Sequence, residues 1–335
     1  MKKMILMAGI LVGSFFYSAK AQDDYNKGFY IKAGGAYFLK VTPVEFPAIG
    51  GQPARDRIFN IIPGDPPTQQ TVSESTITGS FGEGWRVGLT PGYRFSRILG
   101  VEIGLNYYNS RSQDMMRQRG SLGGNEVLNL HNSGKVKAFD VAPALVAHIP
   151  TSSNVKPYVK AGVIIPIGGY LEITTTANDR TGSIAESMHM VPANVPPGST
   201  MILANVERVD RIKANPTVGF QSAIGFDWML NDRISIYAEL EYRNISVGGK
   251  KKELHDLSGE YTVVYNGQPV ANGSLSKDAA SESSKLVNYH KTITSGDNVA
   301  GWEGFDSSKP ADELRSYINI GGLGVNLGIK IPFGN

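Results

Sequence analysis

The last stretch of the chain, from Tyr317 to Phe333, alternates between apolar and polar or small residues, most regularly from Leu323 onward. From Leu323 onward every odd position is apolar, whereas the even positions between them are glycine, asparagine or lysine, and then Pro332. Because successive side chains of a β-strand point to opposite faces, this pattern predicts a strand with one apolar face and one face that tolerates a charge. A half-buried strand of a soluble protein would look similar when taken alone.

Seven earlier segments repeat this alternation, and each has about the 9–11 residues with which a tilted strand crosses the hydrocarbon of a membrane. They are residues 29–39, 85–95, 99–107, 139–149, 157–167, 218–228 and 234–242. The fifth of these segments has the least polar inner face, because Ile164 lies on it. The number of predicted strands is eight, and an even number is typical of bacterial outer-membrane barrels.

The connections between these segments alternate between long and short. The long ones are residues 40–81, 111–134, 168–215 and 248–316, whereas residues 96–97, 150–156 and 231–232 form short turns. This asymmetry is typical of outer-membrane barrels, which have long extracellular loops and short periplasmic turns. Strand extensions are predicted near residues 71–80, and Asn266-Gly267 predicts a hairpin over residues 261–270.

These observations predict an all-β fold, an eight-stranded antiparallel up-and-down transmembrane β-barrel. It has four long extracellular loops, three short periplasmic turns and both termini in the periplasm. The N-terminus has the parts of a secretory signal peptide, with Lys2 and Lys3, an apolar run over residues 4–17, and an A-x-A cleavage site ending at Ala21. We therefore expect residues 1–21 to be removed and residues 22–335 to form one barrel domain in the outer membrane of a Gram-negative cell.

The aromatic residues on the outward phase of the strands fall into two belts. Threading the strands up and down places Tyr37, Trp85, Tyr107, Phe139, Phe220, Tyr242 and Tyr317 at the loop side, and Phe29, Phe95, Trp228 and Phe333 at the turn side. Transmembrane barrels carry such aromatic girdles at both membrane interfaces. The β-sandwich of a soluble protein does not require its aromatic side chains to lie in two such belts.

The chain resembles the outer-membrane β-barrel domain family, which includes the small OmpA-, OmpX- and OmpW-type barrels. The likeness is carried by the signal peptide, the eight alternating segments, the stretch 239–244 (ELEYRN) after a tight turn, and the aromatic-terminated last strand. It implies insertion by the barrel-assembly machinery and contact with outer-membrane lipid and lipopolysaccharide. The chain departs from the family's usual ending, because Gly334 and Asn335 follow Phe333.

The inward phase of the strands carries opposite charges in comparable number. The basic residues are Lys32, Arg86, Arg94, Lys160, Arg243 and Lys330, and the acidic residues are Glu102, Asp140, Asp227, Glu239 and Glu241. An eight-stranded barrel is just wide enough for its side chains, and charges removed from water must be paired. We predict a plug of paired charges. The alternatives are a narrow polar pore or proton path lined by the same residues, and a hydrophobic channel with an apolar vestibule built from Ile164, Pro166 and the loops.

The sequence contains few residues or motifs suited to catalysis or to binding a metal or cofactor. Of the five histidines only His148 lies in a predicted strand, and the others lack zinc-site spacing. There is no cysteine and no nucleophile-elbow or phosphate-loop motif in a strand–helix context, so we expect no cofactor, no metal and no enzymatic activity. Without Lys2, Lys3 and Lys20, 30 basic residues balance 30 acidic ones, which gives no reason to expect nucleic acid as a partner.

Function is therefore expected in the loops. The basic run of residues 250–252 is suited to lipopolysaccharide phosphates, although a solvated loop edge is the plainer interpretation. We predict a monomeric, non-enzymatic barrel whose loops serve envelope integrity or bind an extracellular ligand or protein partner. The alternatives are a channel for small solutes or hydrophobic compounds and, less favoured, an enzyme that modifies lipid A.

Overall fold

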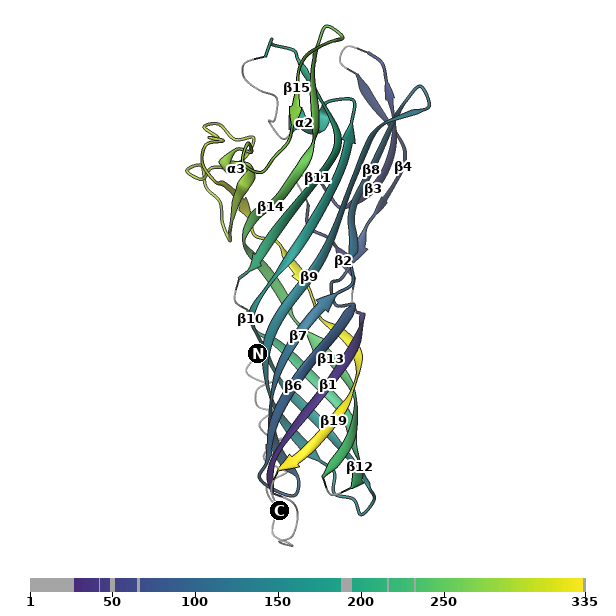
Figure 1. Ribbon diagram of the computed structural model, residues 1–335, viewed down its shortest axis with the longest axis vertical. Coiled ribbons are helices and arrows are strands. Elements are labelled where there is room, and N and C mark those ends of the chain that lie inside the picture. The colour runs from purple at the N-terminus through teal and green to yellow at the C-terminus, as the bar shows by residue number, and fades with distance from the viewer. Residues whose placement is uncertain are drawn as a thin grey trace.

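The computed structural model describes residues 27–41, 43–48, 52–64, 67–187, 195–215, 217–231 and 233–333. The predicted signal peptide lies outside these residues, as do Gly334 and Asn335. A β-barrel occupies one end of the molecule, and long β-hairpins continue well beyond it at the other (Figure 1). Among the described residues, none of the helices is long and apolar enough to cross a membrane.

Eight strands close into the predicted antiparallel barrel. In the order of the wall they are β1 (Gly28–Lys40), β6 (Gly84–Arg94), β7 (Leu99–Ser110), β9 (Asn125–His148), β10 (Val155–Asp179), β12 (Gly219–Asn231), β13 (Ile234–Asn244) and β19 (Gly322–Phe333). Each strand pairs antiparallel with the next around the wall. The ring is closed by β19, which pairs with β1 from Phe29↔Phe333 to Lys40↔Gly322. The predicted fold class is confirmed.

Side-chain acceptors hold the short turns at one end of the barrel, called here the turn side. The Ser96 hydroxyl accepts hydrogen bonds from the backbone N–H groups of Ile98 and Leu99. The Asn231 side chain does the same for Arg233 and Ile234. Serine and asparagine favour turns for this reason, because their side chains replace missing backbone partners. The opposite end of the barrel is called the loop side.

The four long connections contain further strands, most of which the sequence analysis did not predict. These strands are β2 (Val44–Glu45), β3 (Arg55–Ile62), β4 (Thr68–Thr76), β5 (Thr78–Gly79), β8 (Gln113–Leu122), β11 (Thr200–Ala214), β14 (Ser246–Tyr265), β15 (Gln268–Ser274), β16 (Leu286–His290), β17 (Ala311–Leu314) and β18 (Tyr317–Asn319). Two short helices, α2 (Ser183–Ser187) and α3 (Glu282–Lys285), lie among them. The strand extension near residues 71–80 is confirmed, as is the hairpin at Asn266-Gly267, where both residues have positive φ.

These strands build a second, upper sheet on the loop side, in the order β4–β3–β8–β9–β10–β11–β14–β15. Its inner face is covered by a buried apolar cluster. The members of this cluster are Phe59, Met116, Leu128, Leu130, Ala177, Ala185, Met201, Leu203, Val206, Leu254, Leu257 and Val263. The upper sheet is therefore a packed extension of the barrel with a core of its own.

The outward face of the wall changes its polarity where the barrel passes into the upper sheet. In β9 the even positions from Leu128 to His148 face inward, and apolar residues such as Leu130 and Val146 lie on both sides of Asp140. The odd, outward positions change from polar residues such as Lys135 to apolar ones such as the exposed Leu145. The change occurs at Phe139, which marks the loop-side edge of the apolar belt. Pairing continues beyond the apolar belt because buried and exposed positions keep alternating, with polar residues in place of apolar ones on the outer face.

The predicted last strand is broken in two. Only β19 belongs to the barrel wall, whereas β18 leaves it and pairs with β14, where Tyr317 lies opposite Gly248. The break falls at Gly321, where a Cβ would lie 2.5 Å from the carbonyl oxygen of Arg243. Gly82 approaches the carbonyl of Gly321 so closely that any side chain on it would collide. Only glycine therefore fits at these two positions, where the chain leaves the wall.

Candidate functional site: a filled lumen and the vestibule above it

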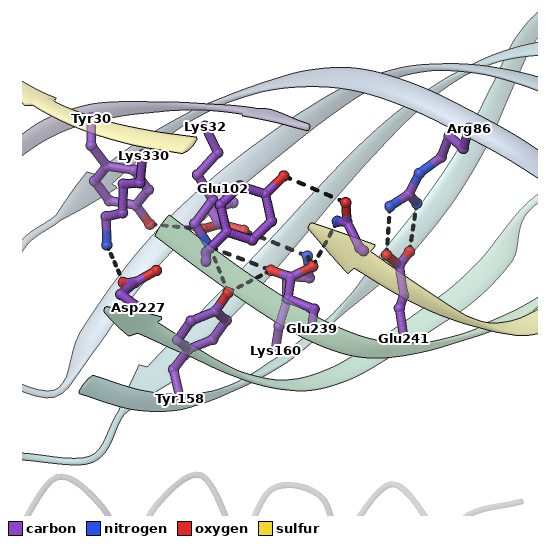
Figure 2. Close-up of polar contacts among 12 residues, drawn as sticks. Tyr30, Lys32, Arg86, Glu102, Tyr158, Lys160, Asp227, Glu239, Glu241 and Lys330 are labelled. Atoms are coloured by element: carbon purple, nitrogen blue, oxygen red, sulfur yellow. Dashed lines mark hydrogen bonds and ion pairs between the residues drawn. The ribbon is translucent and has the colours of Figure 1, made fainter. Parts of the chain in front are cut away.

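Two lysines and two glutamates meet in the middle of the barrel (Figure 2). Lys32 Nζ lies 2.7 Å from Glu102 Oε1 and 3.3 Å from Glu239 Oε1. Lys160 Nζ lies 2.8 Å from Glu239 Oε2 and 3.7 Å from Glu102 Oε2. The Tyr158 hydroxyl donates to Glu239 at 2.8 Å. Each carboxylate thus faces both cations, and all four charges are buried.

Further pairs continue this arrangement toward both ends of the lumen. On the loop side, Arg86 donates two hydrogen bonds of 2.6 and 2.5 Å to the Glu241 carboxylate, a bidentate geometry. Next to it, Arg243 Nη2 lies 2.6 Å from Asp140 Oδ2. On the turn side, Lys330 Nζ lies 2.6 Å from Asp227 Oδ2.

Arg94 occupies a different place from the other predicted interior charges. Its guanidinium donates to the carbonyl oxygens of Ser96 and Arg97 in the turn between β6 and β7. It therefore holds the turn. The other ten predicted residues form ion pairs with one another within the lumen.

Little space is left between these side chains. The cavity among them has a volume of about 20 Å³, and a single water needs at least roughly 10–15 Å³. The lumen is packed so tightly that Gly34 has no room for a Cβ, which would collide with the Tyr237 hydroxyl. The described lumen is thus filled by ion pairs and lacks the width of an aqueous channel.

His148 faces inward near the turn side, at the predicted position. It is 2 % exposed, and neither ring nitrogen has a hydrogen-bond partner among the described residues. Its ring lies 5.7 Å from that of Tyr158, measured between centroids. No serine or carboxylate stands in position to form a catalytic pair with it, and the described residues hold no group of three metal-ligating side chains.

The predicted girdle residues lie on the outside of the molecule, and neighbouring rings touch along the belts. Ring centroids are 5.5 Å apart for Trp85 and Tyr107, and 4.8 Å for Tyr107 and Phe139. On the turn side Phe29 contacts Tyr93 at 4.6 Å, a ring that the two belts of the prediction did not include. Tyr317 needs correction, because β18 carries it out of the barrel wall to the edge of β14.

An apolar vestibule lies above the filled lumen on the loop side. It is a cavity of about 110 Å³ between β9, β10, β11 and β14. Its apolar lining includes Met115, Val136, Ala138, Leu171, Ile173, Ile212, Val247, Ile318 and Ile320. Pro166 also lines it, and Ile164 is buried just below, packed with Ile245 and Val247. This apolar layer separates the vestibule from the ion pairs.

The polar groups at the vestibule wall are already engaged with one another. Burial and the neighbouring Glu313 carboxylate raise the pKa of Tyr289 well above the usual tyrosine value, so its hydroxyl stays protonated. Lys252 Nζ lies 3.4 Å from Glu313 Oε1. Asp210 accepts hydrogen bonds of 2.7 and 2.9 Å from Arg208. The surface left for a ligand is therefore mainly apolar.

One side of the barrel wall is interrupted at the height of the vestibule. Pairing of β10 with β12 ends at Ile164↔Gly219, and pairing of β10 with β11 begins at Tyr170↔Lys213. Between them, residues 165–169 have no described strand partner on that side. A proline, which lacks the N–H that a strand partner would accept, lies in this stretch with two glycines. We call residues 165–169 the wall gap.

An outer groove of about 830 Å³ lies beside the wall gap. It shares Pro166, Gly168, Gly169 and Tyr170 with the lining of the vestibule. The sequence reasoning named Pro166 but missed Leu171, Ile173 and Ile212. The signal that would have found them is the apolar alternation that continues past residue 167 with the opposite face turned inward.

The closed eight-stranded wall, the outward apolar belt and the ion-paired lumen define an outer-membrane β-barrel. Residues 8–266 match the family model for "Outer membrane protein beta-barrel domain", and the chain belongs to this family. The predicted resemblance is confirmed.

Two solved structures are similar to this chain. Outer membrane protein OprG from Pseudomonas aeruginosa is 12 % identical, with 93 % of this chain and 98 % of that chain covered and a TM-score of 0.39. Outer membrane protein W of E. coli is 14 % identical, with 93 % and 100 % covered and a TM-score of 0.27. The sequence matches none of the curated proteins.

Proposed function

We propose that the protein is a monomeric, non-enzymatic outer-membrane barrel that binds a small hydrophobic or amphipathic molecule in the vestibule at the cell surface. The loop side faces outward and the turn side, with both termini, faces the periplasm, as in other bacterial barrels. The observation that carries the proposal is an apolar cavity positioned above a lumen filled by ion pairs. Ligand sites are typically concave and apolar with a few polar groups, and this cavity fits that description.

Filling the vestibule is expected to abolish binding. Ala138 lies on its wall, and Ala138→Phe places a ring inside it. We expect the affinity for an uncharged, environment-sensitive naphthalene dye, measured by fluorescence on protein in nanodiscs, to fall at least roughly tenfold, a loss of about 1.4 kcal/mol. Ile212→Asn, which makes the wall polar without filling it, is expected to weaken binding as well.

The matched control is Ala271→Phe on the exposed hairpin strand β15, away from the vestibule. It should bind the dye as the native protein does. Heat-dependent gel mobility verifies that each variant is folded. Unchanged affinity in folded Ala138→Phe and Ile212→Asn would refute the proposed site.

A second function is favoured by the wall gap, namely lateral passage of the bound molecule into the bilayer. The vestibule and the outer groove share the residues that border this gap, so a hydrophobic compound would reach lipid without crossing the charged lumen. This route supports a channel for hydrophobic compounds, whereas the filled lumen gives no support to a channel for small solutes.

Blocking the wall gap is expected to slow uptake without abolishing binding. A Cβ at Gly168 would meet nothing within 4 Å, so Gly168→Trp adds a bulky side chain at the gap without a backbone clash. We expect uptake of a radiolabelled hydrocarbon by cells carrying this variant to fall several-fold. The affinity of the purified protein for the dye should fall less than the uptake does, although Gly168 also borders the vestibule. Gly296→Trp, in a loop where a Cβ has only one neighbour at 4.0 Å, is the control. Equal uptake by both variants would exclude the lateral route.

A further inference from the structure

The outer groove is formed by parts of the chain that are distant in sequence. Its walls come from residues 166–170 of β10, from Arg211, Lys213 and Ala214 at the end of β11 with Asn215 after it, and from residues 253–255 of β14. Lys277, Lys285 and Leu286, from the segment around α3, complete it. In Figure 1 this segment projects sideways from β14, above the level at which β10 enters the barrel. The groove therefore lies on the outside of the wall, beneath an overhang.

Positive charge dominates the lining of the groove. Arg211, Lys213, Lys277 and Lys285 line it, against one carboxylate, that of Glu253. Three of these cations already pair with carboxylates. Arg211 Nε lies 2.8 Å from Glu172 Oε2, and Lys213 Nζ lies 2.9 Å from Glu253 Oε2. Within α3, Lys285 Nζ lies 3.1 Å from Glu282 Oε1. Such partly exposed ion pairs contribute little to stability, so the cations can turn to another anion at small cost.

The groove begins at the edge of the apolar belt. Gly168 lies opposite the girdle residue Phe139. Lys213 lies opposite Tyr170, two residues further along β10, and Arg211 lies opposite Glu172, four residues further. At about 3.4 Å per residue and a strand tilt of about 45°, these cations stand about 5 and 10 Å above the belt.

Lys213 therefore stands at the depth of the lipid headgroups, and Arg211 stands just above their outer edge. The interfacial layer of a bilayer adds about 5–8 Å on each side of its hydrocarbon. Directly below the cations, the wall presents the apolar side chains of Ile165, Ile167 and Val218 to lipid, and they are 40 %, 67 % and 58 % exposed. A molecule in the groove would therefore meet cations at one end and an apolar wall at the other.

We infer that the outer groove binds a phosphorylated glycolipid of the outer leaflet, lipopolysaccharide, through a phosphate of its lipid A headgroup. The phosphate lies among Arg211, Lys213 and the overhanging lysines, since charge-assisted hydrogen bonds favour it there. The acyl chains lie along Ile165 and Ile167. This site differs from the basic run of residues 250–252, of which Lys252 turns inward to Glu313 and Lys251 pairs with Glu253. It is also a different cavity from the vestibule, although the two share lining residues at the wall gap.

The test compares two triple variants of the full-length protein in zwitterionic detergent. Lys213→Gln/Lys277→Gln/Lys285→Gln removes three charges from the groove. Lys40→Gln/Arg111→Gln/Lys309→Gln removes three charges from exposed loop-side positions outside its lining. Affinity for bisphosphorylated lipid A is measured by titration under native mass spectrometry. We expect the groove variant to lose at least tenfold in affinity and the control variant less than twofold.

Two further measurements identify the ligand chemistry. Lipid A with both phosphates removed should bind weakly and equally to native protein and groove variant, and the conservative Lys→Arg triple should retain native affinity. Inorganic phosphate should compete only weakly, because it lacks the acyl chains. Equal lipid A binding by the two Gln triples, equal binding of phosphorylated and dephosphorylated lipid A by native protein, or displacement of lipid A by equimolar inorganic phosphate would each overturn the inference.

Discussion

Glu241→Leu is expected to destabilise the folded barrel by about 3–5 kcal/mol, because it leaves the Arg86 guanidinium buried without its counter-charge. Both side chains are almost inaccessible to solvent and share two short hydrogen bonds. Arg86→Met is expected to cost a similar amount for the converse reason. Equilibrium urea unfolding in phospholipid vesicles, followed by tryptophan fluorescence, measures both changes.

The double variant Arg86→Met/Glu241→Leu is expected to recover most of this loss, since an apolar pair of similar volume avoids the desolvation of two charges. The exposed pair Lys285→Met/Glu282→Leu is the control, and its single and double changes should be small. If the double variant in the lumen is as unstable as the sum of its single variants, the pair does not act as a unit and the lumen is not a charge-matched plug.

Gly34→Leu is expected to abolish folding of the barrel, with a cost above about 3 kcal/mol, at or beyond the upper range for overpacked cores. A Cβ at this position would strike the Tyr237 hydroxyl and would lie 2.5 Å from the carbonyl oxygen of Leu327. The tyrosine could swing away, but the carbonyl belongs to the adjoining strand β19 and cannot move without breaking the wall. Heat-dependent gel mobility after refolding reports the fraction of closed barrel.

The control for this substitution is Gly168→Leu, at a site where a Cβ meets nothing within 4 Å, and it should fold normally. Gly34→Ala/Tyr237→Ala removes the side-chain clash but keeps the backbone one, so it should remain impaired. A folded Gly34→Leu protein would show that the lumen is looser than its dimensions indicate.

The barrel itself was predictable because the membrane imposes one rule on every residue of the wall. Lipid requires an apolar outward face, so Leu323 to Phe333 and its counterparts show both their strand period and their orientation in the sequence. The same rule placed Lys32, Glu102 and Glu239 on the inner face, where the structure brings them within ion-pair distance.

The upper sheet and the vestibule could not be predicted by the same rule. Above Phe139 the outer face meets water, so polar residues such as Lys135 stand where lipid would require apolar ones, and the stretch looked like a loop. At Pro166 and Gly168 an irregularity in the pairing of β9 and β10 shifts the register, so the inner face passes from even to odd positions, as Leu171 shows. The ion pairs themselves depend on which strands adjoin, and no local pattern encodes that.

The contact between β1 and β19 has a consequence for biogenesis. These two strands lie near opposite ends of the described chain. The barrel therefore stays open along one side, as a slit, until β19 pairs with β1. Until then the strip of lysines and glutamates inside would face acyl chains through the slit, which hydrocarbon does not tolerate. Whatever inserts this protein must therefore shelter the slit until it seals, and sealing joins all twelve residue pairs from Phe29↔Phe333 to Lys40↔Gly322.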